Sequence, residues 1–219
     1  MEKPEKNKEY KEGEPKLEIV FGLEEEIQRV DETIKNLPWF EEHGYAKWLK
    51  LPQHLSQSSS PEDISNSVST EFNASVYKEY VDSIETEFPE IEKKLDALKT
   101  LVNFDLRDRY TIKLTRYGTG GSYNVIKSLV ILNIQRKSKA ELLGTIIHEI
   151  THIGIEDLIQ KYNVKQWQKE RIIDLITERL FPGLHKNQDY QADVSSVETI
   201  FNNFYPDMDA IIKNVGETK

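Results

Sequence analysis

The sequence predicts an α+β protein, and two observations lead to this prediction. Residues 110–117 alternate between apolar and polar side chains and are rich in β formers, and two further strand-like segments follow before residue 135. Residues 139–180 repeat their apolar side chains every three or four positions, which is typical of amphipathic helices. We expect a disordered tail over residues 1–16, a helical N-terminal region over residues 17–104, and a domain with a small antiparallel or mixed sheet over residues 105–219.

The N-terminal region is expected to be helical once its tail has ended. Residues 1–16 are mostly Lys, Glu, Pro, Gly and Asn, a composition that cannot bury a core. Residues 17–37 predict a helix, and residues 53–66, with their run of serines, predict a flexible linker. Residues 71–101 predict two helices or one helix kinked at Pro89.

Four aromatic side chains lie close together within residues 38–51, namely Trp39, Phe40, Tyr45 and Trp48. Because large aromatic side chains dominate core packing, we expect these to pack in the core or between domains rather than to line a binding site. His43 and His54, in the same region, have no ligand spacing and are expected to be surface or structural residues.

Three strands are predicted next, over residues 110–117, 123–126 and 129–134. The glycine-rich run at residues 118–121 separates the first two and predicts a tight turn. A phosphate-binding loop is not favoured there, since neither Lys-Ser nor Lys-Thr follows and no helix opens.

A helix that starts near Lys139 carries the most informative motif in the chain. Ser138 and Glu141 have the spacing of a capping box. The segment His148-Glu149-Ile150-Thr151-His152 then places two imidazoles on one helix face, with a carboxylate beside the first. Two such imidazoles can bind one Zn²⁺, and Glu149 can act as a general base on a water at the metal. The alternative is a pair of core histidines with structural roles.

A catalytic zinc site needs a third protein ligand. The chain has no cysteine, so this ligand must be His, Glu or Asp. Glu156 continues the four-residue spacing, but eight residues of helix place it about 12 Å from His148. The following helix, predicted over residues 164–180 with Asn163 as its N-cap, is a better source because a short turn would lay it across the first helix.

On this second helix, Glu170 and Asp174 are one turn apart. This order, HExxH followed by a helix with a glutamate and an aspartate four residues later, resembles the gluzincins, the thermolysin-like zinc peptidases. The resemblance implies a zincin-like domain, with Glu170 as third metal ligand and Asp174 as the carboxylate that orients His148. A solvated helix face with ion pairs is the alternative for both carboxylates.

Three assignments remain open in the sequence. Glu178 competes with Glu170 as third ligand, although only Glu170 follows His152 closely and has an aspartate one turn later. His185 and Tyr190 are candidates for the donor that stabilises an oxyanion, with ordinary loop residues as the alternative. One of the two strands before the zinc helix is expected to pair with extended substrate backbone, but the sequence does not show which.

Composition limits the function further. The net charge of −9 argues against nucleic acid as the main partner. No apolar run is long enough for a membrane helix, and the charged N-terminus lacks the apolar segment of a secretion signal, so we expect a cytoplasmic protein without a membrane partner.

The leading hypothesis is zinc-dependent hydrolysis of peptides or proteins, with Glu149 as the base. The first alternative is a non-catalytic binding or regulatory module with the same fold. The second is a helical interaction protein in which the motif is fortuitous. Oligomeric state is open.

Overall fold

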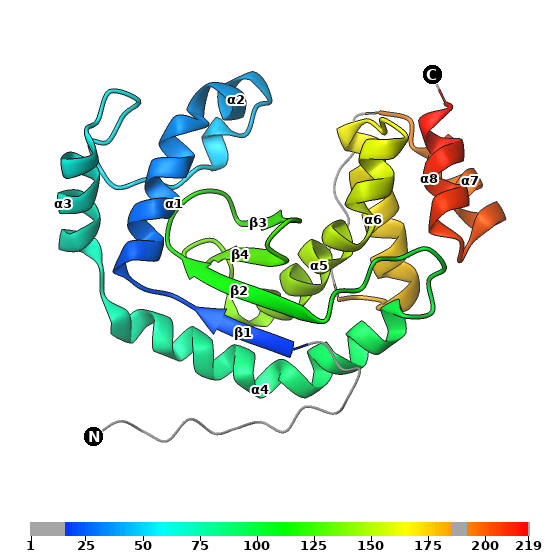
Figure 1. Ribbon diagram of the computed structural model, residues 1–219, viewed down its shortest axis with the longest axis horizontal. Helices are drawn as coiled ribbons and strands as arrows, with labels where there is room; N and C mark the ends of the chain where they lie inside the picture. The colour runs from blue at the N-terminus through cyan, green and yellow to red at the C-terminus, as the bar shows by residue number, and fades with distance from the viewer. Residues whose placement is uncertain (1–15, 185–191, 219) are drawn as a thin grey trace.

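The computed structural model describes residues 16–184 and 192–218, and Figure 1 shows how its helices surround a small sheet. The described part of the chain contains both helices and strands, which confirms the α+β class. In chain order the elements are β1 (Lys16–Val20), α1 (Leu23–Lys35), α2 (Leu37–Glu42), the 3₁₀ helix η1 (Ala46–Trp48), α3 (Pro61–Glu71), α4 (Ala74–Leu98), β2 (Arg109–Thr115), β3 (Gly121–Asn124), β4 (Leu129–Asn133), α5 (Lys139–Lys161), α6 (Gln166–Leu180), α7 (Ser195–Phe204) and α8 (Met208–Gly216).

The sheet is mixed, with strand order β1-β2-β4-β3. β1 and β4 both run parallel to β2, and β3 pairs antiparallel with β4 at one edge. The prediction of a helix from residue 17 and of a disordered Lys16 was wrong, because residues 16–20 form β1 and the helix begins only at Leu23. The segment alternates apolar and polar side chains, as a strand does, and its backbone partner is the distant strand β2. β1 thus belongs to the same sheet as the strands of residues 105–219.

The predicted linker is partly wrong, and the two alternatives for residues 71–101 are now decided. Residues 61–66, predicted as linker, belong to α3, whose first turn is capped by Ser60 and Asp63. Packing of Ile64 and Val68 against α1, in a small second core, stabilises α3. Residues 74–98 form one helix, α4, with Pro89 inside it.

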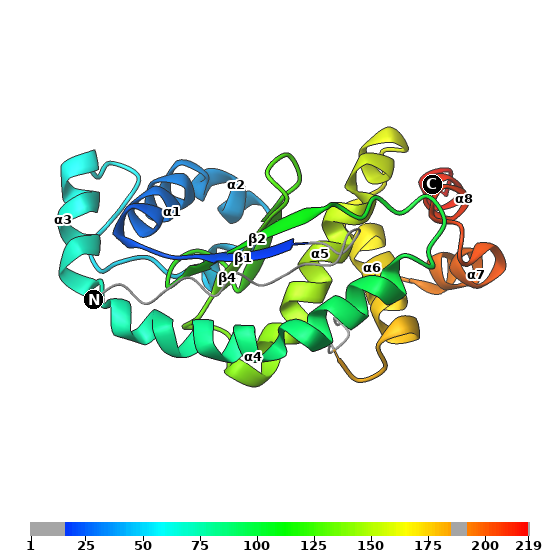
Figure 2. The same ribbon diagram turned by 60° about the horizontal axis from the view of Figure 1, so that its bottom comes forward.

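The helices cover the sheet unevenly. α4 runs the length of the sheet in both views (Figures 1 and 2), and its buried side chains join those of β2, β4 and α5 in the main core. α5 packs against β3, β4 and α4, and α6, α7 and α8 follow beyond it. None of the helices in the described ranges combines the length and apolar character needed to cross a membrane.

The three predicted strands form, with shifted ends. β3 begins at Gly121 and ends at Asn124, so the predicted strand residues Val125 and Ile126 lie in the hairpin turn, where Ile126 is 96% exposed. The reason is local: the Asn124 side chain accepts a hydrogen bond from Lys127 N at 3.1 Å, and Ser128 takes a positive φ of 47°. β3 is therefore a short edge strand beside α5.

Candidate metal centre and its cavity

The helix α5 presents the two histidines from a buried position. Its first turn has the predicted capping box, in which Ser138 N and Oγ donate to the Glu141 carboxylate at 2.9 and 2.6 Å. Its apolar face lies in the main core, and Gly154 admits the ring of Phe104, which a side chain there would displace. His148 and His152 are 6% and 2% exposed, which excludes solvated imidazoles.

The helix α6 brings the third side chain. The predicted N-cap at Asn163 was wrong: α6 is capped by Lys165, whose N–H donates to Gln168 Oε1. Asn163 instead takes a positive φ of 49° in the turn, which asparagine tolerates better than most residues. This turn lays α6 against α5, and Glu170 on the second turn of α6 then faces the histidines.

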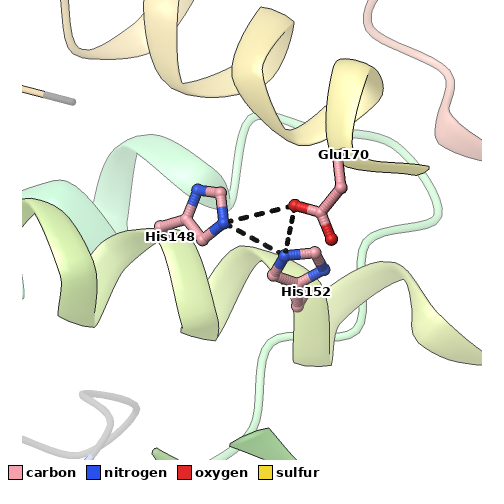
Figure 3. Close-up of side chains that lie close together, drawn as sticks. All are labelled: His148, His152 and Glu170. Atoms are coloured by element: carbon pink, nitrogen blue, oxygen red, sulfur yellow. Dashed lines mark hydrogen bonds and ion pairs between the residues drawn. The ribbon is translucent and has the colours of Figure 1, made fainter. Parts of the chain in front are cut away.

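The three side chains converge on one point (Figure 3). The Nε2 atoms of His148 and His152 are 3.1 Å apart, and Glu170 Oε2 lies 3.6 and 3.4 Å from them, respectively. Zinc bonds of about 2.0–2.1 Å at tetrahedral angles place ligand atoms about 3.3–3.4 Å apart. Among the described residues these three form a group that could hold a metal ion, with all ligand atoms within 4.8 Å. The spacing therefore fits zinc.

Charge in the site is also arranged for a cation. Burial would raise the pKa of Glu170, but its contacts with both imidazoles hold that pKa well below the usual range. Burial raises the pKa of Glu149 to about 7, even though His148 opposes the shift. Two carboxylates and two imidazoles thus lie together in a largely buried site. A metal ion bound there would compensate the negative charge of the carboxylates, which is costly to bury alone.

The glycine-rich run before β3 sets the position of Glu149. A β-carbon at Gly121 would lie 2.9 Å from Thr145 Cγ2 and 3.2 Å from Glu149 Cδ, so only glycine lets β3 approach α5 this closely. Gly118 takes a φ of 81° and forms an isolated β-bridge with Lys50, and Gly121 already belongs to β3, so residues 118–121 are not the single tight turn that was predicted. The run therefore serves close packing at the site.

Tyr123 on β3 packs its ring against the imidazole of His152. Its ring stacks on the imidazole at 4.8 Å with an angle of 11°. Its hydroxyl donates to Glu156 Oε2 at 2.7 Å and accepts from Lys169 Nζ at 2.9 Å. Burial and the adjacent Glu156 carboxylate raise the pKa of Tyr123, which keeps its proton. Glu156 thus holds the tyrosine rather than a metal, in agreement with its exclusion as a ligand.

A cavity of about 470 Å³ opens onto the three side chains. Its lining residues come from α2 and η1, from β3 and the residues before it, from α5 and from the start of α6. Figure 1 shows the ribbons of α2, β3, α5 and α6. The assignment of the aromatic residues to packing was wrong: Trp39, Phe40, Tyr45 and Trp48 all line this cavity, and Trp39 and Trp48 are 49% and 52% exposed. Hydropathy alone cannot separate a core tryptophan from one that lines a cavity.

Comparisons with known proteins found no matching family model, curated protein or solved structure. What the site can do must therefore be argued from its own residues.

The other residues singled out in the sequence have four different outcomes. Asp174 is fully buried one turn beyond Glu170 on α6. Glu178, the competing ligand, is exposed and lies outside the metal-binding group. His185 and Tyr190 lie outside the described residues. His43 and His54 are exposed, as expected for surface residues.

Sequence reasoning missed Tyr45, Tyr123 and Lys169. Burial and the charge of Glu170 raise the pKa of Tyr45, although a hydrogen bond with Gln166 opposes the shift. Gln166 in turn donates to Glu170 Oε1 at 2.6 Å. The only signal for Tyr45 was its place in the aromatic cluster, and for Lys169 its position next to Glu170.

Proposed function

We propose that the protein is a zinc-dependent peptidase of the gluzincin type. The observation that carries this proposal is the near-tetrahedral spacing of three ligand atoms, 3.1, 3.4 and 3.6 Å apart, from His148, His152 and Glu170. Two imidazoles and one carboxylate are the ligand set of catalytic rather than structural zinc, which is usually closed by a fourth protein ligand. When bound, zinc supplies a Lewis acid for the scissile carbonyl and lowers the pKa of water.

Glu149 is the proton carrier in this proposal. Its carboxylate lines the same cavity as the three ligands, beside His148. It accepts a proton from the attacking water and delivers it to the leaving nitrogen, so that one side chain serves as base and then as acid. A protein whose metal site was purely structural would have no use for a buried carboxylate there.

A tyrosine donor completes the proposed chemistry. Tyr123 and Tyr45 both face the cavity, but the Tyr123 hydroxyl donates to Glu156. Tyr45 retains its proton, since its pKa is raised, and its hydroxyl forms a hydrogen bond with Gln166 at the start of α6. We assign Tyr45 as the donor that stabilises the developing oxyanion. His185 and Tyr190, which the sequence suggested, remain further candidates for this role.

The substrate backbone is proposed to pair with β3. β3 is at the edge of the sheet, whereas β4 is enclosed between β2 and β3. An extended peptide can add to such an edge and cross the cavity next to the ligands. Between the two strands that the sequence left open, the edge position favours β3.

The test compares the native protein with Glu149→Gln. Both are loaded with zinc, incubated with a mixed peptide library and analysed by mass spectrometry, with zinc content measured in parallel. Native protein should cleave peptides, whereas Glu149→Gln should keep zinc and fold but lose cleavage, because Gln cannot accept the proton. Cleavage that persists in the variant would contradict the role of Glu149. A zinc-loaded native protein that cleaves nothing would favour the non-catalytic module.

A further inference from the structure

The cavity has one wall made of aromatic side chains, which we call the aromatic wall: Trp39, Phe40, Tyr45 and Trp48. None of the residues of α2 or η1 is buried, although Leu37 packs at the edge of the second core. Two tryptophans that remain about half exposed, at 49% and 52%, place a large apolar surface in contact with water. Such surface beside a reactive site is typical of a ligand-binding wall.

The wall is held in place before any ligand binds. The Trp39 ring stacks with His43 at 4.3 Å and with Tyr45 at 5.7 Å, with interplanar angles of 18° and 7°. Behind it, Lys50 and Gly118 exchange two backbone hydrogen bonds of 3.0 and 2.8 Å, which fix the segment to the turn before β3. A preformed aromatic surface binds a side chain without first being ordered, which favours affinity.

The border of the wall is basic, although the whole chain has a net charge of −9. Lys47 Nζ and Arg136 Cζ lie 5.2 and 5.6 Å from the centre of the Trp48 ring. Lys137 lies at the cavity, since its Cε would be 3.3 Å from a β-carbon on Gly120, which lines the cavity. Within residues 16–184 and 192–218, none of these three cations forms an ion pair with a carboxylate, whereas Lys169 in the cavity pairs with Glu156.

From this we infer that the aromatic wall selects peptides in which a large apolar side chain and an acidic residue lie two positions apart. The apolar side chain covers the Trp39 and Trp48 rings, and the carboxylate meets Arg136, Lys47 or Lys137. The inference rests on the proposed function, since it describes the substrate of the same site. Successive side chains of an extended peptide point to opposite sides, so two residues that are two positions apart in a peptide on β3 can both face the wall.

Four peptide libraries test this preference, each blocked at both ends and randomised except at two central positions separated by one residue: Phe-Xaa-Asp, Phe-Xaa-Lys, Ala-Xaa-Asp or Ala-Xaa-Lys, in which Xaa is any residue. Binding is measured by fluorescence polarisation to zinc-loaded Glu149→Gln, which retains the cavity, and cleavage is measured with native protein. Phe should bind about 10- to 100-fold more tightly than Ala, from the area it buries. Asp should bind roughly 2- to 5-fold more tightly than Lys, with a difference that shrinks at high salt.

Variants separate the two parts of the inference. In the Glu149→Gln background, Trp48→Ala and Trp39→Ala should each reduce the preference for Phe, while Arg136→Gln should reduce only the preference for Asp. Phe204→Ala removes an exposed aromatic from α7, and Lys93→Gln an exposed cation from α4, both away from the cavity, so they should change neither preference. Circular dichroism checks that each variant is folded.

Equal binding of all four libraries, or preferences that survive the wall variants, would overturn the inference. Cleavage by native protein without these preferences would also overturn the inference about the aromatic wall, but it would support the proposed peptidase activity. Preferential binding without any cleavage would support the wall as a peptide site while contradicting the peptidase.

Discussion

Gly121→Ala should displace the Glu149 carboxylate and slow cleavage without loss of bound zinc. A β-carbon there would lie 3.2 Å from Glu149 Cδ and would also press on the carboxylate oxygen. Ordinary carbon contacts need about 3.5–4.0 Å, so the carboxylate must move by several tenths of an ångström to about 1 Å. A displacement of about 1 Å at a reacting group can lower a rate about 100-fold, and we expect a loss of about 10- to 100-fold in kcat/KM. The three atoms nearest to this β-carbon belong to Glu149 and Thr145 rather than to a proposed ligand, so zinc content should be unchanged.

The adjacent glycine provides a matched control. A β-carbon on Gly120 would meet only the flexible end of Lys137, at 3.3 Å, and Gly120→Ala should therefore cleave peptides at nearly the native rate. Cleavage is followed with one peptide taken from the library screen, with zinc content and thermal melting measured on the same samples. Gly121→Ala that cleaves as fast as Gly120→Ala would refute the proposed position of Glu149, and loss of zinc would refute the separation of base from ligands.

Two further predictions concern the helices that carry the site. Asp174→Asn should weaken zinc binding about 10- to 100-fold while the fold persists, as expected when a carboxylate that orients a ligand is lost; unchanged affinity in a chelator competition would exclude that role. Hydrogen bonds from Ser138 lower the pKa of Glu141, so this cap stabilises the protein above the unfolded pKa of about 4.5 and is lost as pH falls through the lower folded pKa. Ser138→Ala should therefore lower the free energy of unfolding by about 0.5–2 kcal/mol near pH 7 and by less near pH 3, as measured by urea denaturation; an equal loss at both pH values would contradict this.

The parts of the site that the sequence predicts are those set by local geometry. His148 and His152 are one helical turn apart in the chain, so their approach follows from helix periodicity alone. The capping box of α5 is likewise local, and it forms as predicted. The position of Glu170 could be predicted only by assuming a short turn between α5 and α6, because that turn brings Glu170 to the histidines.

The parts that the sequence could not predict depend on contacts between distant segments. β1 pairs with β2 only because the chain returns after α4, and no local pattern encodes that parallel pairing. Trp39 and Trp48 have the composition of core residues, and only their position beside α5 and α6 makes them a cavity wall. The Tyr123–Glu156 hydrogen bond similarly joins an edge strand to a helix.

Zinc content tests the central claim most directly. The native protein, Glu170→Ala and Glu178→Ala are purified without added zinc and analysed by elemental mass spectrometry, and their affinity is then measured by chelator competition. We expect one zinc per chain in the native protein and in Glu178→Ala, and loss of most zinc from Glu170→Ala. A native protein that binds no zinc even when it is supplied, or a Glu170→Ala variant that keeps zinc while Glu178→Ala loses it, would contradict the account.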